Sequence, residues 1–233
     1  MINVLITGAS SEIGTAIVNK LITKDYVDTL FLHYNTNRPF FMSEKKVVYL
    51  RENFSCLTKS DLVYKVLSFV DRIDVLINCA GVISDMAYDN LSPSEFDRVI
   101  HINAKIPYIL TKETFNEMKK YGGKIINISS NVTKYGMGRN NSIVYAASKA
   151  MMDILTIGLA SIGAEYNVLV NSVSPGCINT NLQRCRSDLL NRISMIPLKR
   201  IGEPEDVANM VEYLVSDKGN FITGQIIGVT GGE

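Results

Sequence analysis

The chain has 233 residues, of which 46% are hydrophobic and 20% are charged, and its formal net charge is +1. This length is enough for one sizeable hydrophobic core, and a near-neutral charge gives no electrostatic footprint for nucleic acid or for a membrane surface. We therefore expect a single domain, residues 1–233, whose partners are small molecules or further copies of the chain.

The chain has four cysteines and two histidines, and no CxxC spacing occurs. This set is too sparse for a disulfide framework or a zinc site. No charged segment followed by an apolar stretch opens the sequence, and its apolar runs are shorter than the roughly 20 residues of a membrane helix. These features predict no metal, no membrane segment and a cytoplasmic location with reduced thiols.

Short apolar runs alternate with stretches of helical periodicity along the whole chain. The runs are continuously apolar, which is typical of strands buried on both faces of a parallel sheet. In chain order, the expected strands are 2–6, 29–34, 47–50, 73–78, 124–128, 168–173 and 225–229. The expected helices are 13–24, 60–70, 94–121, 144–165 and 204–216. The alternation predicts an α/β fold, a Rossmann-type doubly wound parallel sheet of about seven strands with helices on both faces.

The first expected strand runs directly into a glycine-containing turn, TGASSEIG, and then into a helix. In a doubly wound sheet this place lies at the carboxyl ends of the strands, where a ligand binds. Gly8 allows a tight turn and Gly14 allows close packing of helix on sheet, while the helix N-terminus suits a phosphate. Glu12 is unusual there, because a carboxylate about 6 Å from a phosphate charge costs roughly 3 kcal/mol at an effective dielectric near 20. We therefore expect Glu12 to turn its side chain out to solvent.

A tyrosine and a lysine four residues apart, Tyr145 and Lys149, stand at the start of an expected helix. This spacing puts both side chains on one face. A phenol of pKa about 10 needs roughly 4 kcal/mol to titrate near pH 7, and one positive charge about 4 Å away supplies that at an effective dielectric near 20. Lys149 can thus activate Tyr145 as an acid–base catalyst. Ser129 and Ser130 follow the strand 124–128, and side-chain alternation lets only one of them meet a substrate.

Together these motifs resemble the short-chain dehydrogenase/reductase family over essentially the whole chain. The family's motifs are matched in order by TGASSEIG at 7–14, NCAG at 78–81, HINAKIPY at 101–108, INISS at 126–130, YAASK at 145–149 and SPGCINT at 174–180. The tail 200–232 looks like that of bacterial 3-oxoacyl-carrier-protein reductases. Glu12 stands where the family's phosphate motif, TGxxxGxG, has its middle glycine.

The resemblance implies an NAD(P)H-dependent oxidoreductase that interconverts a ketone and a secondary alcohol. It implies that Tyr145 exchanges a proton with the reacting oxygen and that Ser130 hydrogen-bonds the same oxygen. Lys149 would bind the nicotinamide ribose and lower the tyrosine pKa, and Asn103 would hold a water in a proton relay. The implied catalytic residues are Asn103, Ser130, Tyr145 and Lys149. The implied cofactor-binding residues are Gly8, Ser10, Ser11, Ile13, Gly14, Tyr34, Asn35, Thr36, Arg38, Asn53, Asn78, Ala80, Gly81, Tyr145, Lys149, Pro175, Gly176, Ile178 and Thr180.

The segment after the second expected strand bears on the choice between NAD and NADP. An acid about 20 positions beyond the glycine turn normally binds the adenosine 2′-hydroxyl of NAD, but no carboxylate occurs in 29–42. Asn35, Thr36 and Arg38 could instead bind a 2′-phosphate, Arg38 through a charge-assisted contact. Against this, many NADP-preferring family members carry a basic residue at the position of Ser11. The balance favours NADP(H) over NAD(H).

Two features of the sequence concern the substrate. The family places its substrate lid near 181–196, and a segment this short suggests an open site. Tyr166 and Asn167 stand where carrier-protein reductases often have an Arg-Gly pair that docks the acidic carrier. A small polar keto compound such as a sugar is therefore an alternative to a 3-oxoacyl thioester.

Other functions are also compatible with parts of the pattern. Glu12 suggests a dinucleotide-binding sensor or scaffold without turnover, whereas the presence of both Tyr145 and Lys149 argues against it. A nucleotide-sugar epimerase would need a further substrate domain that 233 residues cannot supply. Family members usually assemble as tetramers through the two long helices and the last strand, so the resemblance predicts a homotetramer.

Overall fold

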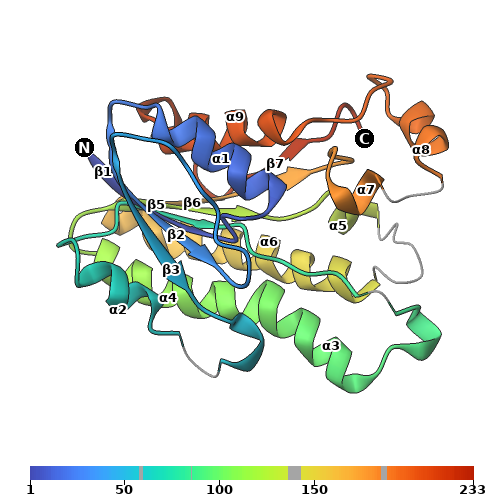
Figure 1. The fold of residues 1–233 in the computed structure, drawn as a ribbon, viewed down its shortest axis with the longest axis horizontal. Helices are drawn as coiled ribbons and strands as arrows, with labels where there is room; N and C mark the ends of the chain where they lie inside the picture. Colours follow the sequence, from blue (N-terminus) through green and yellow to red (C-terminus); the bar gives the residue numbers. More distant parts are fainter. Residues whose placement is uncertain (58–59, 85, 136–142, 185–187) are drawn as a thin grey trace.

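The computed structural model describes residues 1–57, 60–84, 86–135, 143–184 and 188–233. Its described strands form one seven-stranded sheet of order β3-β2-β1-β4-β5-β6-β7, and every neighbouring pair is parallel (Figure 1). The strands are β1 (Ile2–Thr7), β2 (Val27–Tyr34), β3 (Lys46–Arg51), β4 (Val75–Asn78), β5 (Gly123–Ile128), β6 (Val168–Pro175) and β7 (Ile226–Val229). The predicted doubly wound sheet is confirmed, because the strand order reverses between β1 and β4.

Nine α-helices are described, and they cover both faces of the sheet and its carboxyl edge (Figure 1). They are α1 (Glu12–Ile22), α2 (Leu62–Leu67), α3 (Pro93–Ile100), α4 (Ile106–Met118), α5 (Val132–Tyr135), α6 (Ile143–Gly163), α7 (Asn181–Arg184), α8 (Leu189–Met195) and α9 (Pro204–Val215). Helices α1 and α9 pack side by side on one face, whereas α2, α4 and α6 pack on the other. Each face therefore buries its own hydrophobic layer.

Strand β1 shows why the apolar runs are continuous. Val4 and Ile6 belong to the layer under α1 and α9, and Leu5 belongs to the layer under α2, α4 and α6. All three side chains are fully buried. Successive residues of a strand point to opposite faces, so a strand covered on both sides needs an apolar residue at every position.

The long helix expected at 94–121 is interrupted by a π-helical turn, His101–Lys105, which lies between α3 and α4. Two helix starts are capped by side chains: the Ser92 hydroxyl accepts a hydrogen bond from Glu95 N at the start of α3, and Glu203 and Asp206 form a capping box at the start of α9. A single π turn inside an α-helix often marks a functional site. This one carries Asn103.

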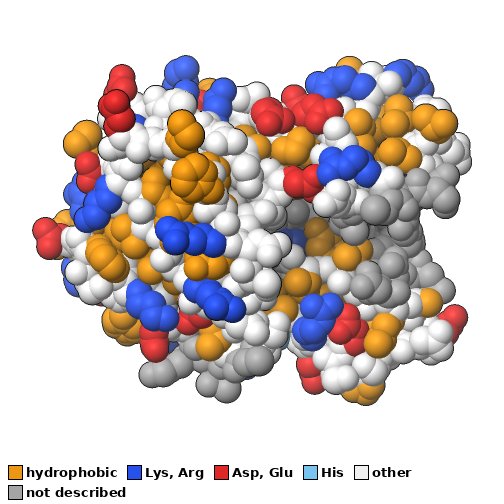
Figure 2. All heavy atoms as spheres, viewed as in Figure 1, with side chains coloured by type: hydrophobic (Ala, Val, Ile, Leu, Met, Phe, Trp, Pro, Cys, Tyr) orange, Lys and Arg blue, Asp and Glu red, His pale blue; other side chains and the backbone are white. Residues whose placement is uncertain are grey.

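The carboxyl ends of the strands point toward α5, α7 and α8, and the space-filling view is hollowed between the strand edge and the part that carries α7 and α8 (Figures 1 and 2). These three helices have seven residues or fewer and have no strong periodic signal in the sequence. They were not expected. They lie at the edge where the predicted site residues gather.

Within the described residues, 143–166 is the stretch long and apolar enough to cross a membrane by length and composition alone. The sequence argument, based on uninterrupted apolar runs, misses it because charged residues such as Lys149 and Asp153 interrupt the run. Both of those side chains are buried, and α6 packs against β6. These are the properties of a helix in a protein core.

Candidate active site

The glycine turn connects β1 to α1 with almost no free space. Gly8 has φ +66°, and a Cβ there would lie 2.7 Å from the Cα of Ala80. A Cβ at Gly14 would lie 2.2 Å from the carbonyl oxygen of Gly8. Ser11 caps the helix, because its hydroxyl donates to Gly8 O at 2.8 Å and accepts from Gly14 N at 3.0 Å. The two glycines are therefore required by close backbone approach.

This turn leaves backbone donors without partners. In the described part of the structure, the N–H groups of Ser10, Glu12 and Ile13 donate to no protein atom. They lie at the N-terminus of α1, where the helix dipole is positive. This donor set fits the diphosphate of a dinucleotide, and a Cβ at Gly8 or Gly14 would collide with the backbone that shapes the turn.

The motif 78–81 at the end of β4 is tied to the end of β1. The hydroxyl of Thr7, a buried side chain, accepts hydrogen bonds from Cys79 N at 3.0 Å and from Ala80 N at 3.1 Å. Asn78 is buried and donates from Nδ2 to Asn127 Oδ1 at 2.9 Å. A Cβ at Gly81 would lie 3.4 Å from Lys149 Nζ and from Asn103 Oδ1. The loop thus links the glycine turn to two predicted catalytic side chains.

His33, in β2, supports the glycine turn from the other side. Its Nδ1 accepts a hydrogen bond from Gly8 N at 3.2 Å, and its Nε2 lies 3.0 Å from Glu52 O. The ring stacks on Phe54, with centroids 4.0 Å apart. Burial lowers the pKa of His33 to about 4, so the ring is neutral at pH 7 and one nitrogen can accept.

Tyr145 and Lys149 lie in the first two turns of α6, as their spacing predicts. The ammonium of Lys149 is 5.7 Å from the centroid of the Tyr145 ring. The Ser130 side chain lies near enough to the Tyr145 hydroxyl to lower its pKa. Ser129 instead is buried, with its hydroxyl 3.5 Å from Lys149 O. Of the two serines, Ser130 is the one beside the tyrosine.

The electrostatics of this pair differ from the simple expectation. Burial raises the pKa of Tyr145, and the nearby Ser130 side chain opposes that rise. Burial also lowers the pKa of Lys149 to about 8. Lys149 Nζ donates to Ile128 O at 2.7 Å. The ammonium is thus directed at a strand carbonyl in this arrangement.

Asn103 is fully buried in the π turn and both ends of its amide are used. Oδ1 accepts from Val82 N at 2.8 Å, and Nδ2 donates to Val82 O at 2.8 Å and to Ser148 Oγ at 3.0 Å. The side chain therefore fixes the loop after β4 against α6. The predicted contact with a relay water stays a prediction.

The predicted adenosine-binding residues lie at the carboxyl ends of β2 and β3. Arg38 stacks over the Tyr49 ring at 4.3 Å from its centroid. Arg51, the last residue of β3, pairs with Tyr34 in the sheet and donates from Nε to Asn35 O at 3.1 Å. Two guanidinium groups are therefore available at this end of the sheet. Thr36 follows in the same connection, and Asn53 caps the short turn after β3 through Ser55 N.

The segment after β6 carries the remaining predicted cofactor residues. Pro175 O accepts from Asn131 N at 2.8 Å and Gly176 N donates to Val229 O at 2.9 Å, which hold the segment between α5 and β7. Ile178 pairs with Gly202, and Thr180 ends the turn before α7. These residues lie at the carboxyl edge next to the N-terminus of α1.

Glu12 does not turn freely into solvent, contrary to the expectation. Its Oε2 accepts a hydrogen bond from Asn181 N at 2.7 Å, and its Oε1 forms an ion pair with Arg184 Nη2. The carboxylate is thus directed at α7, 169 residues further along the chain. Its charge is compensated by the guanidinium.

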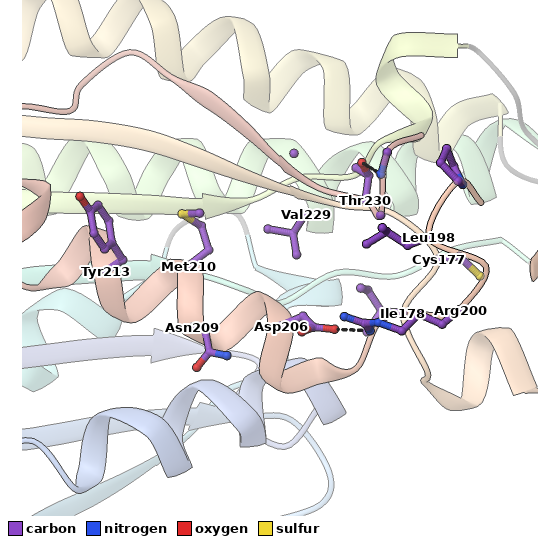
Figure 3. Close-up of a pocket in the computed structure, with 15 residues that line it drawn as sticks. Cys177, Ile178, Leu198, Arg200, Asp206, Asn209, Met210, Tyr213, Val229 and Thr230 are labelled. Carbon is purple, nitrogen blue, oxygen red and sulfur yellow. Dashed lines mark hydrogen bonds and ion pairs between the residues drawn. The ribbon is translucent and has the colours of Figure 1, made fainter.

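The large cavity shown in Figure 3, of about 730 Å³, lies elsewhere. It is lined by α9, β7 and the connection 197–202, with an ion pair between Arg200 and Asp206 at one end. Of the predicted site residues only Ile178 contacts it. None of the predicted catalytic side chains faces it, so we place the site at Tyr145 rather than in this cavity.

Three residues of this region are missing from the sequence-based set. Thr7 and His33 hold the glycine turn, and Arg51 brings a second guanidinium to the adenosine end. Thr7 is part of the motif TGASSEIG, and Arg51 directly follows the predicted strand 47–50. A search for polar residues at the ends of adjacent strands would have found both.

Comparisons with known proteins agree with this geometry. The family model described as enoyl-(acyl carrier protein) reductase matches residues 58–233. An acetoacetyl-CoA reductase of Acinetobacter sp. is 32% identical over 98% of this chain and 96% of its own length. A 3-oxoacyl-[acyl-carrier-protein] reductase of Rickettsia conorii is 36% identical over 98% of this chain and 95% of its own length.

Comparison with solved structures also finds a reductase of the same fold. YwfH, described as an NADPH-dependent reductase involved in bacilysin biosynthesis, superposes with a TM-score of 0.87 at 26% identity, covering 99% of this chain and 97% of that chain. The order of the motifs, the sheet and the relatives all point to one family. The chain belongs to the short-chain dehydrogenase/reductase family and is an oxidoreductase.

Proposed function

We propose that the protein reduces the ketone of a 3-oxoacyl thioester to a secondary alcohol with NADPH. The observation that carries the proposal is the buried ammonium of Lys149, which lies 5.7 Å from the centroid of the Tyr145 ring. The names of the relatives, acetoacetyl-CoA reductase and 3-oxoacyl-[acyl-carrier-protein] reductase, favour a thioester over a keto sugar.

The chain's own residues would handle the proton and the reacting oxygen. NADPH supplies the hydride when bound. Tyr145 donates its proton to the carbonyl oxygen, and Ser130 holds that oxygen by a hydrogen bond. The raised pKa of Tyr145 keeps the hydroxyl protonated at pH 7, which is the form that reduction needs. Lys149, with a pKa of about 8, is mostly charged at pH 7 and favours the phenolate that forms.

The groups available for the cofactor support NADPH over NADH. The unpartnered N–H groups at the start of α1 would bind the diphosphate. The guanidinium groups of Arg38 and Arg51, together with Asn35 and Thr36, would bind the adenosine 2′-phosphate, and no carboxylate in 29–42 opposes it.

The test is oxidation of NADPH, followed at 340 nm, with acetoacetyl-CoA and with a small keto sugar. We expect turnover of the thioester, and a loss of about a thousandfold in kcat for Tyr145→Phe. Tyr121→Phe, at an exposed tyrosine outside the site, is the matched control and should keep full activity. Tight NADPH binding without turnover of any carbonyl would instead favour a sensor, and turnover of the sugar alone would overturn the thioester assignment.

We also propose that residues 181–196 act as a short substrate lid and that the protein is located in the cytoplasm. We further propose that it assembles as a homotetramer. The outer face of α6 exposes four apolar side chains at helical spacing: Met151, Ile154, Ile157 and Ile162. Such a stripe is typical of an interface rather than of a free surface. The thiol of Cys79, which forms no disulfide, fits a reducing compartment. Light scattering should give four times the chain mass, and Ile154→Lys should reduce it; a monomer at micromolar concentration would contradict the proposal.

A further inference from the structure

The glycine turn and α7 are joined by a carboxylate that the family motif lacks. Glu12, the first residue of α1, accepts from Asn181 N at 2.7 Å and pairs with the guanidinium of Arg184. The motif TGxxxGxG has glycine at this position, and glycine has no side chain to make either contact. The connection is therefore a property of this chain.

Arg184 is held by more than one acceptor. Its Nη1 donates to Asn179 O at 3.1 Å and to Asn179 Oδ1 at 3.2 Å, and its Nη2 donates to Asn181 Oδ1 at 2.7 Å. Asn179 in turn donates from Nδ2 to the carboxylate of Glu203 at 3.0 and 3.2 Å. An isolated exposed ion pair is worth little, but a network of charge-assisted hydrogen bonds fixes its members in one geometry. The guanidinium thus ties α1, the turn before α7 and the start of α9 together.

The network lies beside the backbone N–H groups that would bind the diphosphate. The unpartnered N–H groups of Ser10, Glu12 and Ile13 are in the same turn as the Glu12 side chain. The segment that the carboxylate holds, 178–184, contains Ile178 and Thr180 of the predicted cofactor set. An anion in the turn would lie between the helix N-terminus and this segment.

We propose that Glu12 and Arg184 form a latch that holds segment 178–184 over the diphosphate of bound NADPH and slows its release. The inference rests on the proposed function. The Glu12 side chain has a positioning role, since the carboxylate contacts the segment that it holds and not the cofactor. Arg184 has a second effect, because its positive charge compensates a carboxylate that would otherwise repel the diphosphate.

The latch predicts changes in the rate of NADPH release that differ from those expected if the Glu12 carboxylate only repelled the cofactor. Glu12→Gln removes the ion pair but keeps an acceptor for Asn181 N, and it should raise the rate of NADPH release about fivefold. Arg184→Met should raise the release rate further, because the carboxylate is then uncompensated. The double variant should release NADPH more slowly than Arg184→Met alone. If Glu12 only repels the cofactor, Glu12→Gln would instead tighten binding.

The experiment measures NADPH fluorescence in stopped-flow displacement and amide hydrogen exchange of the ligand-free protein. Glu205→Gln, the same charge change in the first turn of α9, is the matched control and should change neither readout. Faster exchange of the amides of 178–184 in Glu12→Ala, together with faster NADPH release, would support the latch. Unchanged or slower release in Glu12→Gln, with normal NADPH binding by the wild type, would overturn the latch alone. Absence of NADPH binding by the wild type would overturn the proposed function and the latch with it.

Discussion

The two sides of the site are held by different kinds of contact. Lys149 is 3% exposed and is fixed by the geometry of α6 and by the carbonyl of Ile128. The side chains of Glu12 and Arg184 are 36% and 45% exposed and come from positions 172 residues apart. The interior of a long helix therefore positions the proposed chemistry, whereas exposed contacts between the ends of two helices, α1 and α7, control what covers the cofactor. The placement of Lys149 on α6 beside Tyr145 can be foreseen from spacing in the sequence, whereas the contacts of Glu12 cannot.

The largest expected effect comes from filling the glycine turn. Gly14→Ala puts a Cβ 2.2 Å from Gly8 O, and neither backbone can move without displacing β1 or α1. We expect a loss of about 3 kcal/mol in the free energy of unfolding and loss of NADPH binding. The measurements are urea denaturation and a fluorescence titration with NADPH.

Gly158→Ala is the control for this change. Gly158 lies inside α6 and a Cβ there meets no atom within 4 Å, so alanine should stabilise the helix by about 0.5–1 kcal/mol. A Gly14→Ala protein as stable as Gly158→Ala would show that the turn is looser than its contacts indicate.

The next prediction concerns the buried side of the site, and it removes the charge of Lys149. The folded pKa of Lys149 is about 8, below the ordinary 10.5, so folding disfavours its charged form. That cost is full below pH 8 and disappears as the pH rises toward 10.5. At pH 7 the free energy of unfolding of Lys149→Met should therefore be about 2 kcal/mol higher than that of the wild type, a value from which the lost hydrogen bond to Ile128 O is already subtracted. The activity of this variant should be abolished. The gain should shrink at pH 10, and a variant less stable at pH 7 would contradict the assignment.

His33 gives the glycine turn a pH dependence of its own. Its folded pKa is about 4, below the ordinary 6.5, so its contribution to stability is present above pH 6.5 and is lost as the pH falls toward 4. Between pH 7 and pH 5 the free energy of unfolding of the wild type should fall by about 2 kcal/mol more than that of His33→Gln, because the glutamine amide does not titrate. Urea denaturation at both pH values measures the difference. Equal losses in both proteins would mean that His33 is not held neutral.

The smallest effect is expected at the exposed adenosine end. Arg51→Gln removes one guanidinium near Asn35 and should weaken NADPH binding about tenfold while leaving NADH binding unchanged. Arg72→Gln, at an exposed arginine before β4, is the control for the loss of one positive charge. Equal weakening of both cofactors would remove Arg51 from the 2′-phosphate site.

The fold could be predicted from the sequence because buried parallel strands demand apolar residues at every position. Val4, Leu5 and Ile6 illustrate this, since they face two different layers and all had to be apolar. The juxtaposition of Tyr145 and Lys149 was also predictable, because four residues make one helical turn. The orientation of the Lys149 ammonium toward Ile128 O was not, because it depends on the distance between α6 and β5.

The contacts of Glu12 lay beyond the same reasoning. Nothing in the local pattern of TGASSEIG indicates that Asn181 and Arg184 will lie beside it. The short helix α7 has only four residues and therefore no periodicity to detect. Pairs of exposed polar residues far apart in sequence are placed by the whole fold, so a local argument could only assign Glu12 to solvent.

The hydroxyl of Thr7 has a consequence for how the protein is made. It binds the amides of Cys79 and Ala80, which emerge from the ribosome 72 and 73 residues later. Strand β2, synthesised earlier, can pair with β1 and bring His33 to the turn, but the Thr7 side of the turn stays open until β4 has been synthesised and docked. The turn that would hold a dinucleotide is therefore complete only after residue 80 has been added, so supplying the cofactor would rescue destabilised full-length variants but not fragments that end before β4.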